Sequence, residues 1–385
     1  MTFLTTAPRS VRDAACSTDA RQRAGQLADR MAARLAEDPA RSHFPEEEFN
    51  WLRAADLHTY VLPGAPPVPF HDLLLTLAQV GRGNLAVGRI WEGHVNAMQL
   101  MDEFGTDQQK RRWADEVRTE GRLSGVWNAE ARDELRVVRT APGRYRLEGC
   151  KTFCSGSKYV TRPIVPGRLI DEAGRAGGRQ MTVIPLDRVR TEIDPTFWRP
   201  LGMASSVSHR IDFTGVELTD ADLLGTPDDY HVQPRFSGGA IRFTAVQLGG
   251  AQALVDATRH FLRTLNRTDD PYQQHRLGEM AVLIEGGYNW LAGGARRWEA
   301  QHEQPAETLV QYANMMRTAV EHICLDVIRL TERCVGARGL LEPQPFGRLV
   351  RDLTHYLRQP NPDGALAAVG RHVGTQTAPA HELWD

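Results

Sequence analysis

The period of the hydrophobic residues changes twice along the chain, and this change constrains the fold more than any other feature. From about Asp19 to Arg118 apolar residues recur every three or four positions, as in amphipathic helices. From about Leu123 to Leu224 short strand-like runs alternate with Pro- and Gly-containing breaks, and from about Gly238 long amphipathic stretches return. The order predicts three domains, namely an N-terminal α-helical domain (1–122), a central β-barrel domain (123–226) and a C-terminal four-helix-type bundle (227–385).

Within these blocks the pattern predicts individual elements. Helices are expected over 20–35, 73–80, 86–104, 240–265, 276–303 and 306–335, strands over 144–149, 162–165, 181–184 and 209–213, and a loop over the proline-rich stretch 63–69. The strands suggest a small antiparallel barrel or sandwich of ~100 residues. Two helical blocks flanking it would form a deep interface, which is a preferred place for a cofactor or ligand.

Composition excludes several classes of protein. Hydrophobic residues make up 41% and charged residues 24% of the chain, as in globular proteins. A formal charge of -2 offers no field for nucleic acid or an anionic membrane. The five cysteines are scattered, so neither a metal site nor a disulfide framework is expected, and no apolar run approaches the ~20 residues of a membrane span. We expect a soluble cytoplasmic protein.

Common nucleotide and hydrolase signatures are absent. The sequence has no P-loop ending in Gly-Lys-Ser/Thr, no Rossmann glycine triplet, no Gly-x-Ser-x-Gly and no His-Glu-x-x-His. This argues against kinases, NAD dehydrogenases, α/β-hydrolases and zinc proteases.

Six motifs follow one another in an order that resembles the acyl-CoA dehydrogenase superfamily over essentially the whole chain. They are Glu103–Thr106 with Gln109 and Trp113, Ser124–Glu130, Gly149–Gly156, Gly202–Phe213 leading to Asp222–Gly225, Gly336–Gly339 and Arg348–Asp352. The resemblance implies an α+β, acyl-CoA dehydrogenase-like fold and a flavin cofactor, FAD or FMN, held between the barrel and the helices.

The resemblance also implies roles for residues of the barrel. Trp127, Asn128 and Ala129 would line the pyrimidine edge of the flavin ring, where backbone N–H groups suit the negative charge that develops on reduction. Phe153 would pack against the flavin, and Ser155 would donate a hydrogen bond near its reactive N5. The alternative is that Trp127 and Phe153 are barrel core, as aromatic residues in strands usually are.

A second group of residues implied by the resemblance lies in the C-terminal block. Arg267 and Arg276 flank a turn where the family carries an arginine that reaches the FAD pyrophosphate of a neighbouring subunit, and a guanidinium fork suits a phosphate. Gly336 and Arg338 belong to the matched motif near the end of the chain. This version implies a homodimer or homotetramer; the alternative is a polar turn between helices, capped by aspartates.

The sequence departs from the dehydrogenases of this superfamily at the base that removes the α-proton. Pro360 and Ile241 stand about where the two alternative glutamates belong, and Asp363 is a candidate substitute with a different spacing. Motifs around Phe153, Asp270 and Gly336 are instead similar to the flavin monooxygenase branch, which includes dibenzothiophene monooxygenases and amino-sugar N-oxygenases.

That branch implies two histidines at the flavin. His94 falls at the position of the first, where a neutral imidazole could hydrogen-bond the reacting oxygen or take a substrate proton. Gln359 falls near the position of the second. The alternative for His94 is a satisfied core histidine.

Three functions remain open from the sequence. The first is a flavin enzyme that inserts one oxygen atom from O2 into a small molecule, with reduced flavin from a separate reductase. The second is an FAD dehydrogenase with Asp363, Glu92 or His94 as base and an electron-transfer partner. The third is a non-catalytic scaffold.

Overall fold

The computed structural model describes residues 11–38, 41–358, 360–379 and 382–384. Five helices come first: α1 (Val11–Glu37), α2 (Glu46–Ala54), α3 (Phe70–Gly83), α4 (Leu85–Phe104) and α5 (Asp107–Glu120). Ten strands follow: β1 (Leu123–Val126), β2 (Arg136–Ala141), β3 (Arg144–Glu148), β4 (Cys150–Cys154), β5 (Val160–Ile170), β6 (Ala176–Val183), β7 (Glu192–Asp194), β8 (His209–Asp212), β9 (Glu217–Thr219) and β10 (Leu223–Leu224). Five further helices end the described chain: α6 (Arg235–Thr264), α7 (Pro271–Glu299), α8 (Ala306–Gly339), α9 (Phe346–Tyr356) and α10 (Pro362–Thr375).

The strands form two sheets rather than one antiparallel barrel. Seven strands make a barrel-like sheet in the order β10-β6-β5-β2-β3-β9, with β1 added beside β5, and β4, β8 and β7 make a second sheet. Both β1 and β2 run parallel to β5, which the expectation of a purely antiparallel arrangement missed. Buried residues of both sheets, including Leu147, Val165 and Ile211, belong to one hydrophobic cluster.

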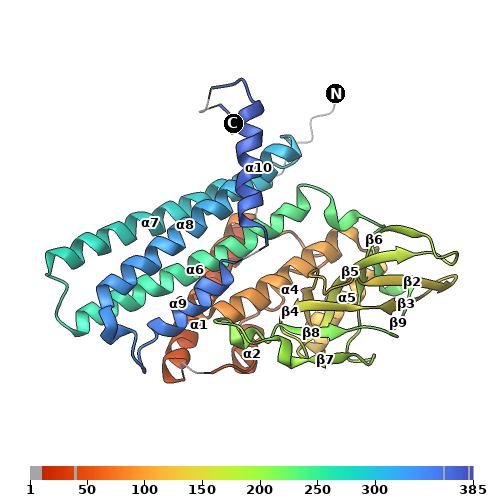
Figure 1. Ribbon diagram of the computed structural model, residues 1–385, viewed down its shortest axis with the longest axis horizontal. Helices are drawn as coiled ribbons and strands as arrows, with labels where there is room; N and C mark the ends of the chain where they lie inside the picture. The colour runs from red at the N-terminus through yellow and green to blue at the C-terminus, as the bar shows by residue number, and fades with distance from the viewer. Residues whose placement is uncertain (1–10, 39–40, 359, 380–381, 385) are drawn as a thin grey trace.

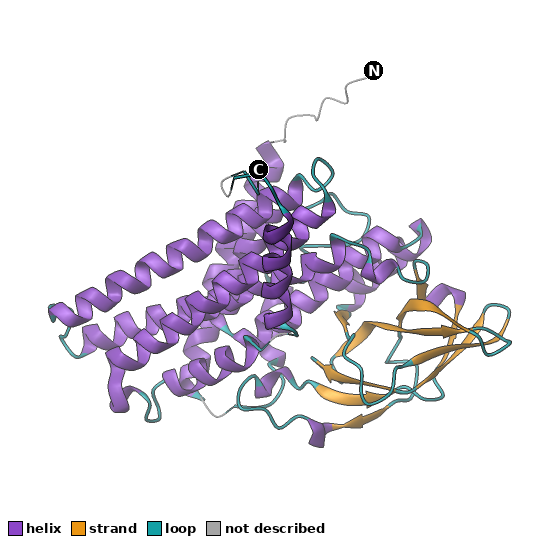
Figure 2. Ribbon diagram, turned by 45° about the horizontal axis from the view of Figure 1, so that its top comes forward, coloured by secondary structure: helices purple, strands orange, loops and turns teal. Residues whose placement is uncertain are grey.

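The two helical blocks form one body, and the barrel covers one end of it (Figures 1 and 2). Helix α3 packs against α1 and α6, and α6 packs against α8, so the N-terminal and C-terminal helices share a core. Helix α4 is buried along most of its length and connects this body to strand β1. The expected arrangement, with the barrel between two helical blocks, is therefore not observed, because α3 and α4 bury apolar residues on more than one side.

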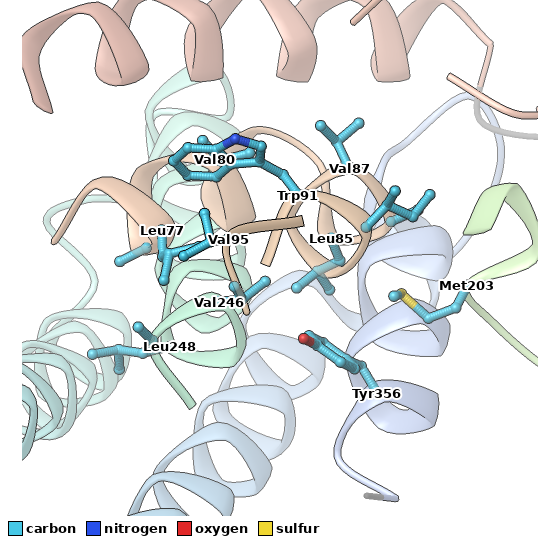
Figure 3. Packing of buried hydrophobic residues seen from close by; sticks show 14 of the residues in the cluster. Leu77, Val80, Leu85, Val87, Trp91, Val95, Met203, Val246, Leu248 and Tyr356 are labelled. Atoms are coloured by element: carbon cyan, nitrogen blue, oxygen red, sulfur yellow. The ribbon is translucent and has the colours of Figure 1, made fainter. Parts of the chain in front are cut away.

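Glycines allow α3 and α6 to approach at backbone distance. A Cβ atom on Gly249 would lie 2.0 Å from the carbonyl oxygen of Ala78, and one on Gly81 would lie 2.4 Å from that of Val246. Figure 3 shows Val246 in this core, close to Leu77 and Val80 of α3. The Gly-Gly pair in α6 thus has a packing reason that outweighs its low helix propensity.

Within the described part of the chain, no helix is both long and apolar enough to cross a lipid bilayer.

The α3–α6 crossing generates a stability prediction. We expect Gly249→Ala to lower the free energy of unfolding by about 2 kcal/mol, because the added methyl group meets fixed backbone of α3. Gly286→Ala in α7 is the matched control, since nothing lies within 4 Å of its added Cβ, and there we expect a gain of about 0.5–1 kcal/mol. Denaturant unfolding of both variants measures the difference, and equal effects would contradict the close crossing.

Candidate functional site

An ion pair within helix α9 hydrogen-bonds to the barrel loop that precedes β8. The Asp352 carboxylate accepts a hydrogen bond from the Met203 backbone N–H at 2.5 Å and pairs with Arg348 at 3.3 Å. Arg348 in turn donates to the Ser205 hydroxyl at 2.6 Å. Met203 and Tyr356 of α9 reach the same buried cluster as Leu85 (Figure 3). These contacts fix the face that α9 presents to the barrel.

An aromatic cluster lies at this junction. Phe153, at the end of β4, is 52% exposed and has a backbone φ of +53°, which is unfavourable for a residue with a side chain. Its ring and that of Trp198 pack in a T-shaped arrangement, with 5.9 Å between the ring centroids. Trp198 and His355 of α9 pack in the same way, with 5.3 Å between the centroids. A half-exposed aromatic ring on strained backbone is typical of a functional position.

The segment after β1 lies beside this aromatic residue. The Trp127 indole N–H donates to the carbonyl of Ser155 at 3.0 Å, and the hydroxyl groups of Ser155 and Ser208 are 2.9 Å apart. The structure therefore brings the 127–129 segment and the 153–155 segment together. Of the two predicted aromatic residues, Trp127 is buried and Phe153 is not.

Residues of strand β4 donate hydrogen bonds to the carbonyl groups of the 128–129 segment. The Asn128 carbonyl accepts from the Lys151 ammonium at 3.3 Å, and the Ala129 carbonyl accepts from the Thr152 backbone N–H at 3.0 Å. Among the described residues, the backbone N–H groups of Asn128 and Ala129 have no acceptor. Two available donors, a half-exposed ring and a serine hydroxyl fit the polar edge and the plane of a flavin ring.

His94 lies on α4 with both ring nitrogens bonded to backbone. Its Nδ1 accepts from the Ser124 backbone N–H at 3.1 Å, so its Nε2 carries the proton and donates to the His58 carbonyl at 3.0 Å. Burial holds the pKa of His94 well below its ordinary value, so the ring is neutral. Both ring nitrogens of His94 are therefore used by backbone groups, and the geometry favours a core histidine whose hydrogen bonds are already satisfied.

His58 stacks on His94 with 4.5 Å between ring centroids. The ring donates through Nε2 to the carbonyl of Arg122 at 2.9 Å. Burial, with a contribution from the nearby charge of Arg53, lowers the pKa of His58 from 6.5 to about 4.

A buried charged cluster lies between α4 and α6. Arg242 is 3% exposed and donates to Gln99 at 2.7 Å and Asn96 at 2.5 Å, while its Nε lies 3.5 Å from Glu92. Glu92 is also paired with Arg89 at 3.0 Å. Because each of its oxygens lies against a guanidinium group, Glu92 is not presented as a free base.

The tyrosines near this cluster are held in the neutral form. Burial raises the pKa of Tyr230 to about 12 and raises that of Tyr356 further. The Tyr356 hydroxyl is buried and has no hydrogen-bond partner among the described residues.

The second predicted group is partly assembled around a cavity between α6 and α8. A cavity of about 410 Å³ is lined by Arg267, Gly336 and Arg338 together with Phe261, Leu265, Val335 and Ala337. Gly336 has a φ of +58°, which interrupts α8 at this point. Arg276 is not among the lining residues. The Phe261 ring meets Phe346, the first residue of α9, at 5.5 Å between centroids, so this cavity borders the start of α9.

The remaining predicted residues are not brought to the aromatic cluster. Asp363 is exposed in the first turn of α10, which projects from the bundle (Figure 1). Gln359 lies outside the described residues. Sequence reasoning missed His355, which lies four positions before Gln359 and does contact the cluster. Its position one helical turn after the Arg351–Asp352 pair is the signal that could have identified it.

The histidine stack generates a pH prediction. The unfolded chain binds a proton at His58 below about pH 6.5 whereas the folded chain does not until about pH 4, so stability falls as the pH is lowered through this window. For His58 alone the loss from pH 7.5 to pH 5 is about 2 kcal/mol. We expect His58→Gln, which keeps an N–H donor for the Arg122 carbonyl, to remove this part of the pH dependence in denaturant unfolding. The exposed His275→Gln is the control, and an unchanged slope in His58→Gln would contradict the buried neutral ring.

Residues 241–357 match the family described as acyl-CoA dehydrogenase, C-terminal domain. A dibenzothiophene monooxygenase from Rhodococcus erythropolis is 25% identical over 90% of this chain and 91% of its own length.

Solved structures agree with the fold. The FMN-bound TdsC from Paenibacillus sp. A11-2 has a TM-score of 0.85 at 22% identity, covering 95% of this chain and 100% of TdsC. Butyryl-CoA dehydrogenase from Megasphaera elsdenii has a TM-score of 0.81 at 16% identity, covering 97% of this chain and 100% of that one. The chain therefore has the acyl-CoA dehydrogenase fold, as its motifs predicted.

Proposed function

We propose that the protein is a flavin-dependent monooxygenase that transfers one oxygen atom from O2 to a small molecule. The observation that carries the proposal is the junction of the 127–129 segment, Phe153 and Ser155, where two free N–H donors, a half-exposed ring and a hydroxyl meet. The curated relative named as a monooxygenase supports oxygen transfer. So does the presence of Pro360 and Ile241 where the dehydrogenase branch carries a glutamate base.

The cofactor is FAD or FMN, and when bound it supplies the two electrons and the reaction with O2. Residues of this chain would hold it. The N–H groups of Asn128 and Ala129 would face its pyrimidine edge, Phe153 would pack against the ring, and the Ser155 hydroxyl would donate near N5. Reduced flavin would come from a separate reductase, since no sequence motif for NAD(P)H is present.

His355 is the group best placed to move a proton at this site. It lies on α9 against Trp198, and α9 is held in place by the Asp352 and Arg348 contacts. Burial lowers the pKa of His355 below its ordinary value, so the neutral ring can accept a proton from a substrate at neutral pH. The cluster of Phe153, Phe197 and Trp198 beside it suits an aromatic substrate.

A dehydrogenase is the second candidate, because butyryl-CoA dehydrogenase shares the fold. The buried carboxylate of Glu92 on α4 is not available as its base, since Arg89 and Arg242 hold both oxygens. Anaerobic incubation with substrate separates the two functions. Bleaching of the bound flavin by substrate without O2 would indicate a dehydrogenase. Product formation that requires both O2 and reduced flavin supports the monooxygenase.

We expect His355→Asn to lower turnover by about 10²-fold, the usual loss when acid–base assistance is removed. The assay supplies reduced FMN from a flavin reductase and follows product from dibenzothiophene or indole, the compounds that name relatives of this chain or are bound to them. His260→Asn, an exposed histidine on α6, is the control. Equal turnover in the two variants would remove His355 from the proposal.

The cavity lined by Arg267 and Arg338 gives a test of FAD against FMN. If Arg267 and Arg338 hold the pyrophosphate of an FAD from a second subunit, Arg267→Ala with Arg338→Ala weakens FAD binding by at least about 10-fold and leaves FMN binding unchanged. Arg329→Ala, an exposed arginine of α8 paired with Glu279, is the control. Fluorescence titration measures both affinities, and sedimentation tests the homodimer or homotetramer. Equal FAD affinity in all variants would show that Arg267 and Arg338 do not bind the pyrophosphate and that the turn has only a structural role.

A further inference from the structure

Lys151 is fully buried directly behind the segment that the proposed function assigns to the flavin. It is one of three lysines in the chain, and its side chain has 0% exposure. Its ammonium group donates to Glu130 Oε1 at 2.5 Å and to the Asn128 carbonyl at 3.3 Å. Lysine is almost never fully buried unless it is paired, so this placement needs a reason beyond packing.

Arg179 of β6 brings a second cation to the same carboxylate. It donates to Glu130 Oε1 at 2.5 Å and to the Asn128 side-chain carbonyl at 3.2 Å. A second carboxylate, Glu134, pairs with Arg179 at 2.9 Å and with Arg168 at 3.1 Å. In this side-chain network three cations face two carboxylates, which leaves one positive charge in excess.

The network also orders the backbone of the segment. The Asn128 carbonyl is bonded to Lys151, while the Asn128 and Ala129 N–H groups have no acceptor among the described residues. Burial lowers the pKa of Lys151, but the contact with Glu130 opposes this effect and favours the ammonium form. A fixed positive charge and two oriented N–H donors therefore lie on one side of the proposed ring site.

We propose that Lys151 is a positioning residue that makes the site bind anionic reduced flavin more tightly than oxidised flavin. The inference rests on the proposed flavin site. The oxidised ring takes up two electrons from an external reductant and one proton from solvent, and the resulting anion carries its negative charge at the pyrimidine edge. A buried cation behind the 128–129 segment favours that anion and has little effect on the neutral oxidised ring.

Variants of opposite sign test this charge effect. The readout is the ratio of the dissociation constants of oxidised and dithionite-reduced FMN, measured anaerobically by titration of the full chain. Lys151→Met removes the positive charge and is expected to lower the ratio by about 10-fold, whereas Glu130→Gln removes the opposing charge and is expected to raise it by about 10-fold. Lys151→Arg keeps the charge and is expected to stay near the wild-type ratio.

The outcomes are distinguishable. If the wild-type chain binds neither form of FMN or FAD, the proposed function fails. If it binds flavin but Lys151→Met and Glu130→Gln change the ratio in the same direction, or not at all, Lys151 is a structural residue and this inference alone is overturned. Circular dichroism and melting monitor folding, and if Lys151→Met does not fold, the rise expected in Glu130→Gln decides the matter.

Discussion

The contact between Arg348 and Asp352 on α9 and the backbone of the 203–205 loop supports the rest of the proposed site. The loop is a single 3₁₀ turn (Ala204–Ser206) between left-handed conformations at Met203 and Val207, so it has few backbone hydrogen bonds of its own to hold it. A buried carboxylate that accepts from the Met203 N–H and is neutralised by Arg348 supplies that constraint. Breaking one partner of such a pair leaves an uncompensated buried charge, typically at a cost of about 3–5 kcal/mol. The positions of Trp198 and His355 thus depend on this contact.

Buried cations pair with carboxylates within the barrel, within the helical body and at the joint between the two. Arg162 of β5 is bonded to Glu116 of α5 and to Asp187, Lys151 to Glu130, and Arg242 to Glu92. Desolvation makes such pairs weak sources of net stability, but a mispaired charge in the interior is costly, so the Arg162–Glu116 pair restricts how the barrel and the helices can dock.

Hydrophobic periodicity predicted the helices α1, α3, α4, α6, α7 and α8 and the strands β3, β5, β6 and β8, because the buried face of each follows from its own repeat. It did not predict α2, α5, α9 and α10 as individual helices. It could not predict that β1 and β2 run parallel to β5, since pairing joins residues far apart in the chain. Nor could it predict that the helical blocks share a core, which depends on close approach at Gly81 and Gly249. The junction of the 127–129 segment with Phe153 and Ser155 was predictable only through the resemblance, because two short segments about 25 residues apart show no spacing signal.

His94 and His355 show most clearly what the sequence alone could not predict. His94 and His355 both lie in helices, and chain position alone favoured His94 because the resemblance placed it there. The orientation of a helix decides instead: His94 turns to the backbone of Ser124 and His58, so both nitrogens are used, whereas His355 turns to Trp198 and is held there by a contact one turn earlier. Sequence spacing specifies which residues share a face of a helix but not what that face meets. Phe153, Trp198 and His355 come together as a candidate site only when α9 is docked on the barrel. The proposed chemistry therefore depends on the contact between the helical body and the barrel.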